Sequence, residues 1–281
     1  MPAVVKVSPV IKGYRAHKYA YDLIGTDPDS VIVSAAYDEY LLKNPDVVAR
    51  PEIFEKVMRE ILNKPRDRSR SFSASSAGYC MRRQELAFLG QRQKPNLEPR
   101  GIRIFNNGTF VHLRWQIGLL SAGIIDDIEF LVTMPKLRAR ASLDGLGTAV
   151  GGRWGGADFG WEHKGRMSFS WAAQDRAGAP DVKTGKQVDM QMLLTGFDVW
   201  SVTNENKDTQ EVSEFVIQRD ESRIKDARNE LVELNAAIDK QRLHPMLPEC
   251  VKQNKTGEFF KCPFGGVGGA CINSGSWPNR T

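Results

Sequence analysis

Three residues on two neighbouring segments have the types and the spacing for metal-assisted chemistry. Asp144 lies near the end of KLRARASLDGLG, and Glu162 and Lys164 lie within ADFGWEHKGR. Residues two apart on a strand point to the same side, so Glu162 and Lys164 would share one face while His163 points to the other. The glycine-rich connection between the two segments would let them pair as neighbouring strands, which would bring Asp144 close to Glu162.

Two carboxylates that converge on one point predict a cation between them, because they would otherwise repel each other. Oxygen ligands of this kind suit Mg²⁺ or Mn²⁺. A lysine beside such an ion could orient an attacking water or stabilise charge that develops on a phosphate, as phosphodiester hydrolysis requires. Considered alone, the three residues are explained more simply by ordinary surface ion pairs, since Glu-x-Lys is common in strands.

The elements that must position these residues indicate a mixed α/β core. Hydrophobic periodicity and cap residues predict helices over residues 51–64, about 77–89, 108–123 and 220–242. Strands are expected over residues 126–134, 136–147, 157–166, near 197–203 and over 211–219, with a helix from about 182 leading into the fourth. That order predicts an α/β or α+β core with mixed strand directions.

In their order along the chain, these motifs resemble the PD-(D/E)XK nuclease superfamily. SLDG followed by WEHKG resembles its core, and GTFVHLRWQ is similar to the Gly-x-x-x-His helix of the RecB-type branch. QVDMQMLLTG resembles the glutamine-containing helix of that branch, and SFSASSAGYCMRRQELAFLG the serine-led, single-cysteine opening of CRISPR-associated exonucleases and their phage relatives. The resemblance covers residues from about 71 to 271 and implies a restriction-endonuclease-like core, a central mixed sheet flanked by helices.

The resemblance assigns roles to the residues that match its motifs. It implies that Asp144 and Glu162 are carboxylate ligands of a divalent metal ion and that Lys164 is the catalytic lysine. His112 would be a further ligand from its helix, although a lone histidine of this kind more often packs on an apolar neighbour. An imidazole ligand would favour Mn²⁺ over Mg²⁺.

Further residues would contact the substrate. The resemblance implies that Gln191 positions the substrate or a water at the metal, with Gln187 one turn earlier on the same helix. The residue four positions after Gln191, often Tyr in the family, is Thr195, which leaves the role of this helix open. The basic stretch of residues 82–103, which begins with Arg82 and Arg83, would attract a phosphate backbone without reading its sequence.

The four cysteines are candidate ligands of a second metal centre. The relatives complete a 4Fe–4S cluster with three more cysteines near their end, which here implies Cys80 with Cys250, Cys262 and Cys271. Structural zinc usually uses two closely spaced cysteine pairs, which this chain lacks, yet zinc stays the alternative and buried thiols a third. The glycines of KCPFGGVGGAC would let its backbone N–H groups turn toward sulfur, which favours a ligand loop.

Composition excludes several classes of protein. The 281 residues, 41% hydrophobic and 26% charged, argue against a disordered or fibrous chain. No apolar run approaches the roughly 20 residues that cross a bilayer, and the N-terminus has no continuous apolar stretch of a secretory signal. We therefore expect a cytoplasmic protein. Its net charge of +5 permits a polyanionic partner.

These observations predict three regions and one activity. Residues 1–70 would form an N-terminal helical region of unassigned function, residues 71–242 a RecB-like nuclease domain, and residues 243–281 a cysteine-rich segment that completes the cluster with Cys80. The expected activity is Mg²⁺- or Mn²⁺-dependent DNA exonuclease cleavage at single-stranded or frayed duplex ends, in phage or prokaryotic recombination, repair or replication. The alternatives are an inactive DNA-binding accessory protein of the same fold and a zinc-stabilised nuclease.

Overall fold

The structure analysed is a computed structural model of the whole chain. It describes residues 15–16, 31–45, 50–62, 70–91 and 99–247, together with 262, 264 and 271. Cys250 lies outside these residues. None of the described helices is both long enough and apolar enough to cross a membrane.

A five-stranded mixed sheet forms the centre of the molecule. Its strand order is β1-β8-β7-β6-β5, where β5 is Gly145–Thr148, β6 Asp158–Arg166, β7 Val199–Asn206, β8 Val212–Gln218 and β1 Arg15–Ala16. β6 runs parallel to β7 and β1 runs parallel to β8, while the other pairs are antiparallel. Every residue of β7 is buried, as expected for a central strand whose two faces are both covered. The expectation of a mixed α/β fold is confirmed.

A second, smaller sheet has the order β2-β4-β3, where β2 is Phe72–Ser73, β4 Ala139–Leu143 and β3 Phe130–Met134. The single strand that we expected over residues 136–147 is wrong, because the chain leaves one sheet for the other at Asp144. Leu143 still pairs with Phe130 in the smaller sheet, whereas Gly145 pairs with Trp161 in the larger one. Alternating apolar residues continue across this junction, so the pattern alone could not reveal it.

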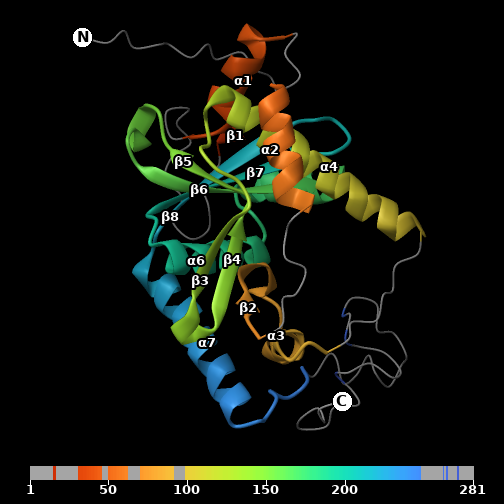
Figure 1. Cartoon of the computed structure of the whole chain (residues 1–281), viewed down its shortest axis with the longest axis vertical. Coiled ribbons are helices and arrows are strands. Elements are labelled where there is room, and N and C mark those ends of the chain that lie inside the picture. The colour runs from red at the N-terminus through yellow and green to blue at the C-terminus, as the bar shows by residue number, and fades with distance from the viewer. Residues whose placement is uncertain are drawn as a thin grey trace.

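Helices cover both faces of the larger sheet (Figure 1). One face packs on α6 (Val182–Thr195) and α7 (Glu221–Asp239), with α3 (Met81–Phe88) beside α7. The other face packs on α4 (Pro99–Ala122) and α1 (Ser34–Lys43), and α2 (Pro51–Leu62) packs on α4. The two hydrophobic cores therefore lie on opposite sides of the strands that carry the predicted site, and the described part of residues 1–70 contributes to the second core.

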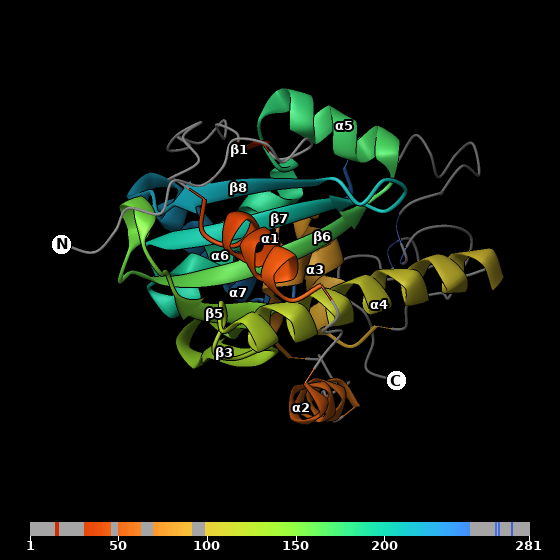
Figure 2. The same cartoon turned by 90° about the horizontal axis from the view of Figure 1, so that it is seen from above.

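Several helices differ from the expected boundaries. α4 begins at Pro99, nine residues before the expected Gly108, and Figure 2 shows its first half extending past the end of the sheet. Its exposed first half has no core to impose an apolar stripe, so periodicity could not mark its start. The sequence analysis also missed α1 and α5 (Ser168–Ala177). In contrast, α6 and α7 begin where Asp181 and Asp220 cap them through backbone N–H groups.

Candidate active site

Strand β6 sends alternate side chains to the two cores and thereby separates their chemistry. Trp161 and His163 pack with Trp115 of α4, while Glu162 and Lys164 point toward α6. The Glu162 side chain is buried, and the Lys164 ammonium donates to its Oε1. Gln191 of α6 donates from Nε2 to the other carboxylate oxygen of Glu162 at 2.9 Å. Each oxygen of this buried carboxylate therefore accepts a hydrogen bond, one from a charged donor and one from a neutral donor.

Asp144 reaches the same place from the junction between β4 and β5. Its Oδ2 accepts a hydrogen bond from the backbone N–H of His163 at 2.9 Å and lies 3.5 Å from Nδ1 of His112 on α4. The ring of His112 meets that of His163 edge-on, with 5.2 Å between the centroids. The pairing of β5 with β6 thus brings Asp144 beside Glu162, as the glycine-rich connection predicts.

The two carboxylates titrate differently because their neighbours differ. Burial and the negative charge of Glu162 raise the pKa of Asp144 well above its usual value. Burial acts the same way on Glu162, but the ammonium of Lys164 and the hydrogen bond from Gln191 outweigh it and lower the pKa of Glu162. Burial alone would lower the pKa of Lys164, yet Glu162 and Asp144 raise it. Lys164 is therefore charged and balances one carboxylate of the pair.

The donor atoms at this point suit a hard divalent cation. Two carboxylates and one imidazole come together, and the Oε1 of Gln191 is buried without a hydrogen-bond partner among the described residues. These are the oxygen and nitrogen donors that Mg²⁺ and Mn²⁺ accept. As they stand in the part of the chain that the structure describes, however, no three His, Cys, Asp or Glu side chains form a group that could hold a metal ion.

A buried acidic residue that the sequence analysis missed fastens α4 to the sheet. Glu205 of β7 accepts hydrogen bonds from Arg114 and from the indole N–H of Trp115, both on α4. Its side chain is 1% exposed. His163 completes the arrangement by sharing a hydrogen bond of 2.9 Å with Thr203 Oγ1. Because Arg114 and Trp115 lie two and three residues after His112 on the same helix, this anchor fixes the part of α4 that carries the imidazole. The clue was a run of polar residues, VTNEN, within a strand buried on both faces.

The structure separates the two arginines that we expected to contact DNA. Arg82 is buried and donates to the backbone oxygens of His244 at 2.8 Å and Cys271 at 3.0 Å. Its guanidinium therefore holds the C-terminal segment rather than an external partner. Arg83 is partly exposed. Gln187 lies at the site, where its Oε1 accepts from Lys164 Nζ at 3.3 Å.

Three of the four cysteines come from distant parts of the sequence to one region. Cys80 precedes α3, and Cys262 and Cys271 belong to a small core with Leu86 of that helix. Burial raises the pKa of the Cys80 thiol, and Cys262 and Cys271 raise it further. None of the three forms a disulfide. Residues 262 and 271 are thus held at α3, about 180 positions earlier in the sequence.

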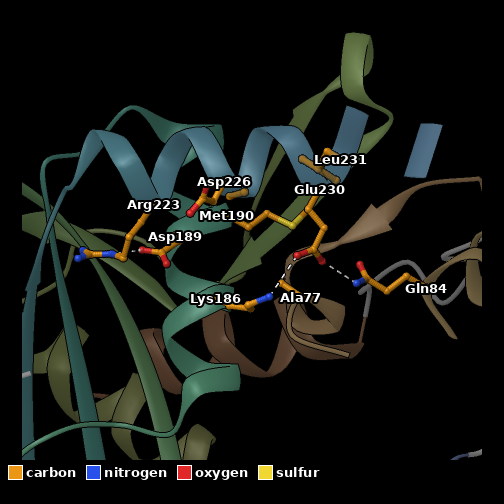
Figure 3. Close-up of a pocket in the computed structure, with 10 residues that line it drawn as sticks. Ala77, Gln84, Lys186, Asp189, Met190, Arg223, Asp226, Glu230 and Leu231 are labelled. Atoms are coloured by element: carbon orange, nitrogen blue, oxygen red, sulfur yellow. Dashed lines mark hydrogen bonds and ion pairs between the residues drawn. The ribbon is translucent and has the colours of Figure 1, made fainter. Parts of the chain in front are cut away.

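A cavity of about 130 Å³ lies on the opposite side of α6, between that helix, α3 and α7. Figure 3 shows that ion pairs and hydrogen bonds cross it, with Glu230 contacting both Gln84 and Lys186. Asp189 pairs with Arg223 at 3.0 Å beside it. The residues that line this cavity include none of the predicted site residues.

Comparisons with known proteins give structural neighbours only. No protein-family model matches the chain, and no curated protein matches its sequence. An alkaline exonuclease (LHK-Exo) from Laribacter hongkongensis is 18% identical with a TM-score of 0.46, over 68% of this chain and 93% of its own. The complex of LHK-Exo with dAMP is 19% identical with a TM-score of 0.44, over 61% of this chain and 91% of its own. The protein SSO0001 is 14% identical with a TM-score of 0.41, over 65% of this chain and 84% of its own. Likenesses this distant say nothing about the activity, which has to be inferred from the site.

Proposed function

We propose that this protein is a metal-dependent DNA exonuclease. The observation that carries the proposal is the convergence of Asp144, Glu162 and His112 from three elements, next to the ammonium of Lys164. Asp144 and Glu162, with His112, would hold a Mg²⁺ or Mn²⁺ ion. Burying two carboxylates costs folding free energy, because each charge that is removed from water needs a partner. Functional sites nevertheless commonly contain buried ionisable groups with perturbed pKa values.

The side chains of the site divide the work of phosphodiester hydrolysis among them. When bound, the divalent ion would supply Lewis-acid stabilisation of the charge that develops on the phosphate. Lys164, held by Glu162 and Gln187, donates a charged hydrogen bond to a phosphate oxygen in a water-poor site, where such a bond is strong. Gln191 keeps the carboxylate of Glu162 oriented. Asp144, whose pKa is raised, would have to release its proton in order to act as a carboxylate ligand of the ion.

The choice of substrate follows from charge and from the resemblance. A net charge of +5 suits a polyanion, and Arg83 and Gln187 would contact the DNA backbone near the site. The preference for single-stranded or frayed duplex ends, and a role in phage or prokaryotic DNA metabolism in the cytoplasm, rest on the resemblance alone. The regions 1–70, 71–242 and 243–281 are retained as the proposed division of the chain.

The gathering of Cys80, Cys262 and Cys271 supports a second metal centre. With Cys250 as the fourth ligand, these thiols would hold a 4Fe–4S cluster, or alternatively zinc. Elemental analysis of anaerobically purified protein distinguishes the two. Iron with visible absorbance near about 400 nm supports the cluster, zinc supports the alternative, and the absence of both metals would leave packed thiols.

The decisive experiment is a digestion of end-labelled DNA with Mg²⁺, Mn²⁺ or EDTA. The wild type is expected to release nucleotides from ends only with a divalent ion. Glu162→Gln, which keeps the size of the side chain, is expected to lower the rate at least about 100-fold, while DNA binding persists. Unchanged cleavage by Glu162→Gln would refute the assignment of the site.

An inactive DNA-binding protein of the same fold is the second candidate. It is favoured by one contact, the ion pair between Lys164 and Glu162, which lets the buried carboxylate persist without a metal ion. Wild-type protein that binds DNA but never cuts it with Mn²⁺ present would establish this candidate.

A further inference from the structure

A row of polar side chains leads along α6 from the candidate active site to the surface. Lys183, Gln187 and Gln191 are spaced four residues apart, so they lie on successive turns of one side of the helix. Gln191 is fully buried and contacts Glu162, while Gln187 is 7% exposed. Lys183, at the outer end, is only partly buried. The row thus connects the buried carboxylates with solvent.

At the outer end of this row, two cations contact one tyrosine. Lys183 Nζ donates to Tyr79 Oη at 2.5 Å and lies 4.0 Å from the ring centroid. The guanidinium carbon of Arg83 lies 3.3 Å from the same centroid. Burial alone would raise the pKa of Tyr79, but Lys183 and Arg83 outweigh it and lower this pKa. Two positive charges therefore lie beside this one phenol.

These two cations differ from their neighbours in lacking a carboxylate. Within the described residues, neither Arg83 nor Lys183 forms an ion pair, although Lys186, one turn along, pairs with Glu230 and Arg166 pairs with Asp181. Two unneutralised charges that share one ring repel each other. An anion from outside the chain would relieve that repulsion.

A glycine beside the cluster fixes how closely its two segments approach each other. Gly78, directly before Tyr79, has φ +79° and is exposed, and a Cβ there would lie 3.1 Å from the Cα of Lys183. Glycine is therefore required for both the backbone conformation and the close approach of the two segments. The cluster thus has a partly exposed rim and a fixed geometry.

We propose that Tyr79, Arg83 and Lys183 form a binding site for a phosphodiester of the DNA strand whose end lies at Lys164. This inference rests on the proposed nuclease function and extends it by naming where the strand leaves the site. Two cations and a phenol hydroxyl supply charge-assisted hydrogen bonds to phosphate oxygens. Because Arg83 and Lys183 both contact the Tyr79 ring, the cluster would bind the phosphate backbone rather than stack on a base. It would therefore not distinguish between DNA sequences. Lys183 lies four residues before Gln187 on α6, a rise of about 6 Å along the helix.

Binding of a single-stranded oligonucleotide in EDTA, where no cleavage occurs, tests the site. Lys183→Gln and Arg83→Gln are each expected to raise Kd about tenfold. Each is also expected to reduce the slope of log K against log salt by about 0.7. Lys186→Gln is the matched control, because it removes a lysine of the same helix that already pairs with Glu230, and its Kd should equal that of the wild type. Thermal melts check that all three variants are folded.

A neutral methylphosphonate linkage, moved one position at a time along the oligonucleotide, locates the contact. One position is expected to weaken binding to the wild type and to have no further effect on Lys183→Gln. Wild-type protein that cuts DNA while Lys183→Gln and Arg83→Gln keep the wild-type Kd and salt slope would overturn the inference and leave the function standing. An equal loss in Lys186→Gln would also overturn it. Wild-type protein that neither binds nor cuts DNA would instead overturn the proposed function.

Discussion

At the scale of single residues, the site depends on how buried charges are balanced. Glu162 is 1% exposed and Asp144 lies beside it, so the protein bears the cost of placing two carboxylates away from water. Lys164 offsets that cost for one of them, and the other holds its proton more tightly. The positive charge of Lys164 and the raised pKa of Asp144 both reduce the repulsion between the two carboxylates. The site can therefore fold without a metal ion.

The first prediction concerns the ion pair of Lys164 and Glu162. Lys164→Met leaves Glu162 buried without its counter-charge, so it is expected to lower the free energy of unfolding by about 3 kcal/mol. Adding Glu162→Gln to this variant removes the stranded charge and is expected to restore most of the loss. Urea unfolding at neutral pH measures both. Equal stability of Lys164→Met and the wild type would show that the pair does not balance the site.

A second prediction at this scale concerns Asp38 of α1. Burial, together with the negative charge of Glu214, raises the pKa of Asp38 from 3.8 to about 6. Between these values the folded state keeps a proton that the unfolded chain has released, so stability falls as pH rises through this window. Near pH 8, Asp38→Asn is therefore expected to melt roughly 2–4 °C above the wild type, allowing for solvent screening. Near pH 4, where the wild-type carboxyl is largely protonated, the two melting temperatures are expected to be nearly the same.

The control for Asp38 is its exposed neighbour Glu39, which pairs with Lys43 on the surface. Glu39→Gln should change the melting temperature little at either pH. A stabilisation by Asp38→Asn that was the same near pH 4 and near pH 8 would contradict the assigned cause.

At the scale of secondary-structure elements, α4 matters most because it carries His112 to the edge of the larger sheet. The C-terminal half of α4 is fixed by Glu205, whose carboxylate accepts hydrogen bonds from Arg114 and Trp115. The sequence predicted a helix over residues 108–123 between two glycines, and the resemblance singled out its histidine. It did not predict the anchor, because a glutamate in a strand is ordinarily a surface residue and only the packing of both sheet faces buries it.

The third prediction tests that anchor. Glu205→Gln keeps the shape of the side chain but removes the charge that Arg114 neutralises, and it is expected to cost about 2–3 kcal/mol of stability. Amide exchange in residues 112–118 should accelerate in this variant more than in α7. Arg138→Ala, which breaks only the exposed pair with Asp239, is the control and should cost less than about 1 kcal/mol. Unchanged exchange in α4 would show that Glu205 does not hold the helix.

The strands show both the strength and the limit of sequence patterns. Glu162 and Lys164 were correctly assigned to one face of the strand and His163 to the other, because side chains alternate between the two faces of any extended chain. The division of residues 136–147 between two sheets was not predictable in the same way. It depends on which partner each half pairs with, and that choice is made by the three-dimensional packing around Asp144.

At the scale of the whole molecule, the segment that opens with SFSASS joins the smaller sheet to the C-terminal segment. β2 pairs with β4, while α3 receives the C-terminal segment through Arg82, Glu85 and the small core around Leu86. The sequence placed Cys80 and the C-terminal cysteines together only through the resemblance. The polar contacts that hold them could not be predicted, because they join residues about 160 positions apart.

The last prediction concerns the attachment of this C-terminal segment to α3. The imidazole of His244 contacts the buried carboxylate of Glu85 and, through Nε2 at 3.0 Å, that of Glu233. Burial alone would lower the pKa of His244, but these two carboxylates outweigh it and raise the pKa above its usual 6.5. The stabilisation is therefore complete below that value and is lost as pH rises through the raised pKa. His244→Gln should accordingly be less stable than the wild type near pH 5.5, with a smaller difference near pH 9, as urea midpoints would show. A difference that grew with pH would mean that the neutral imidazole, and not the ion pairs with Glu85 and Glu233, holds the end of the chain in place.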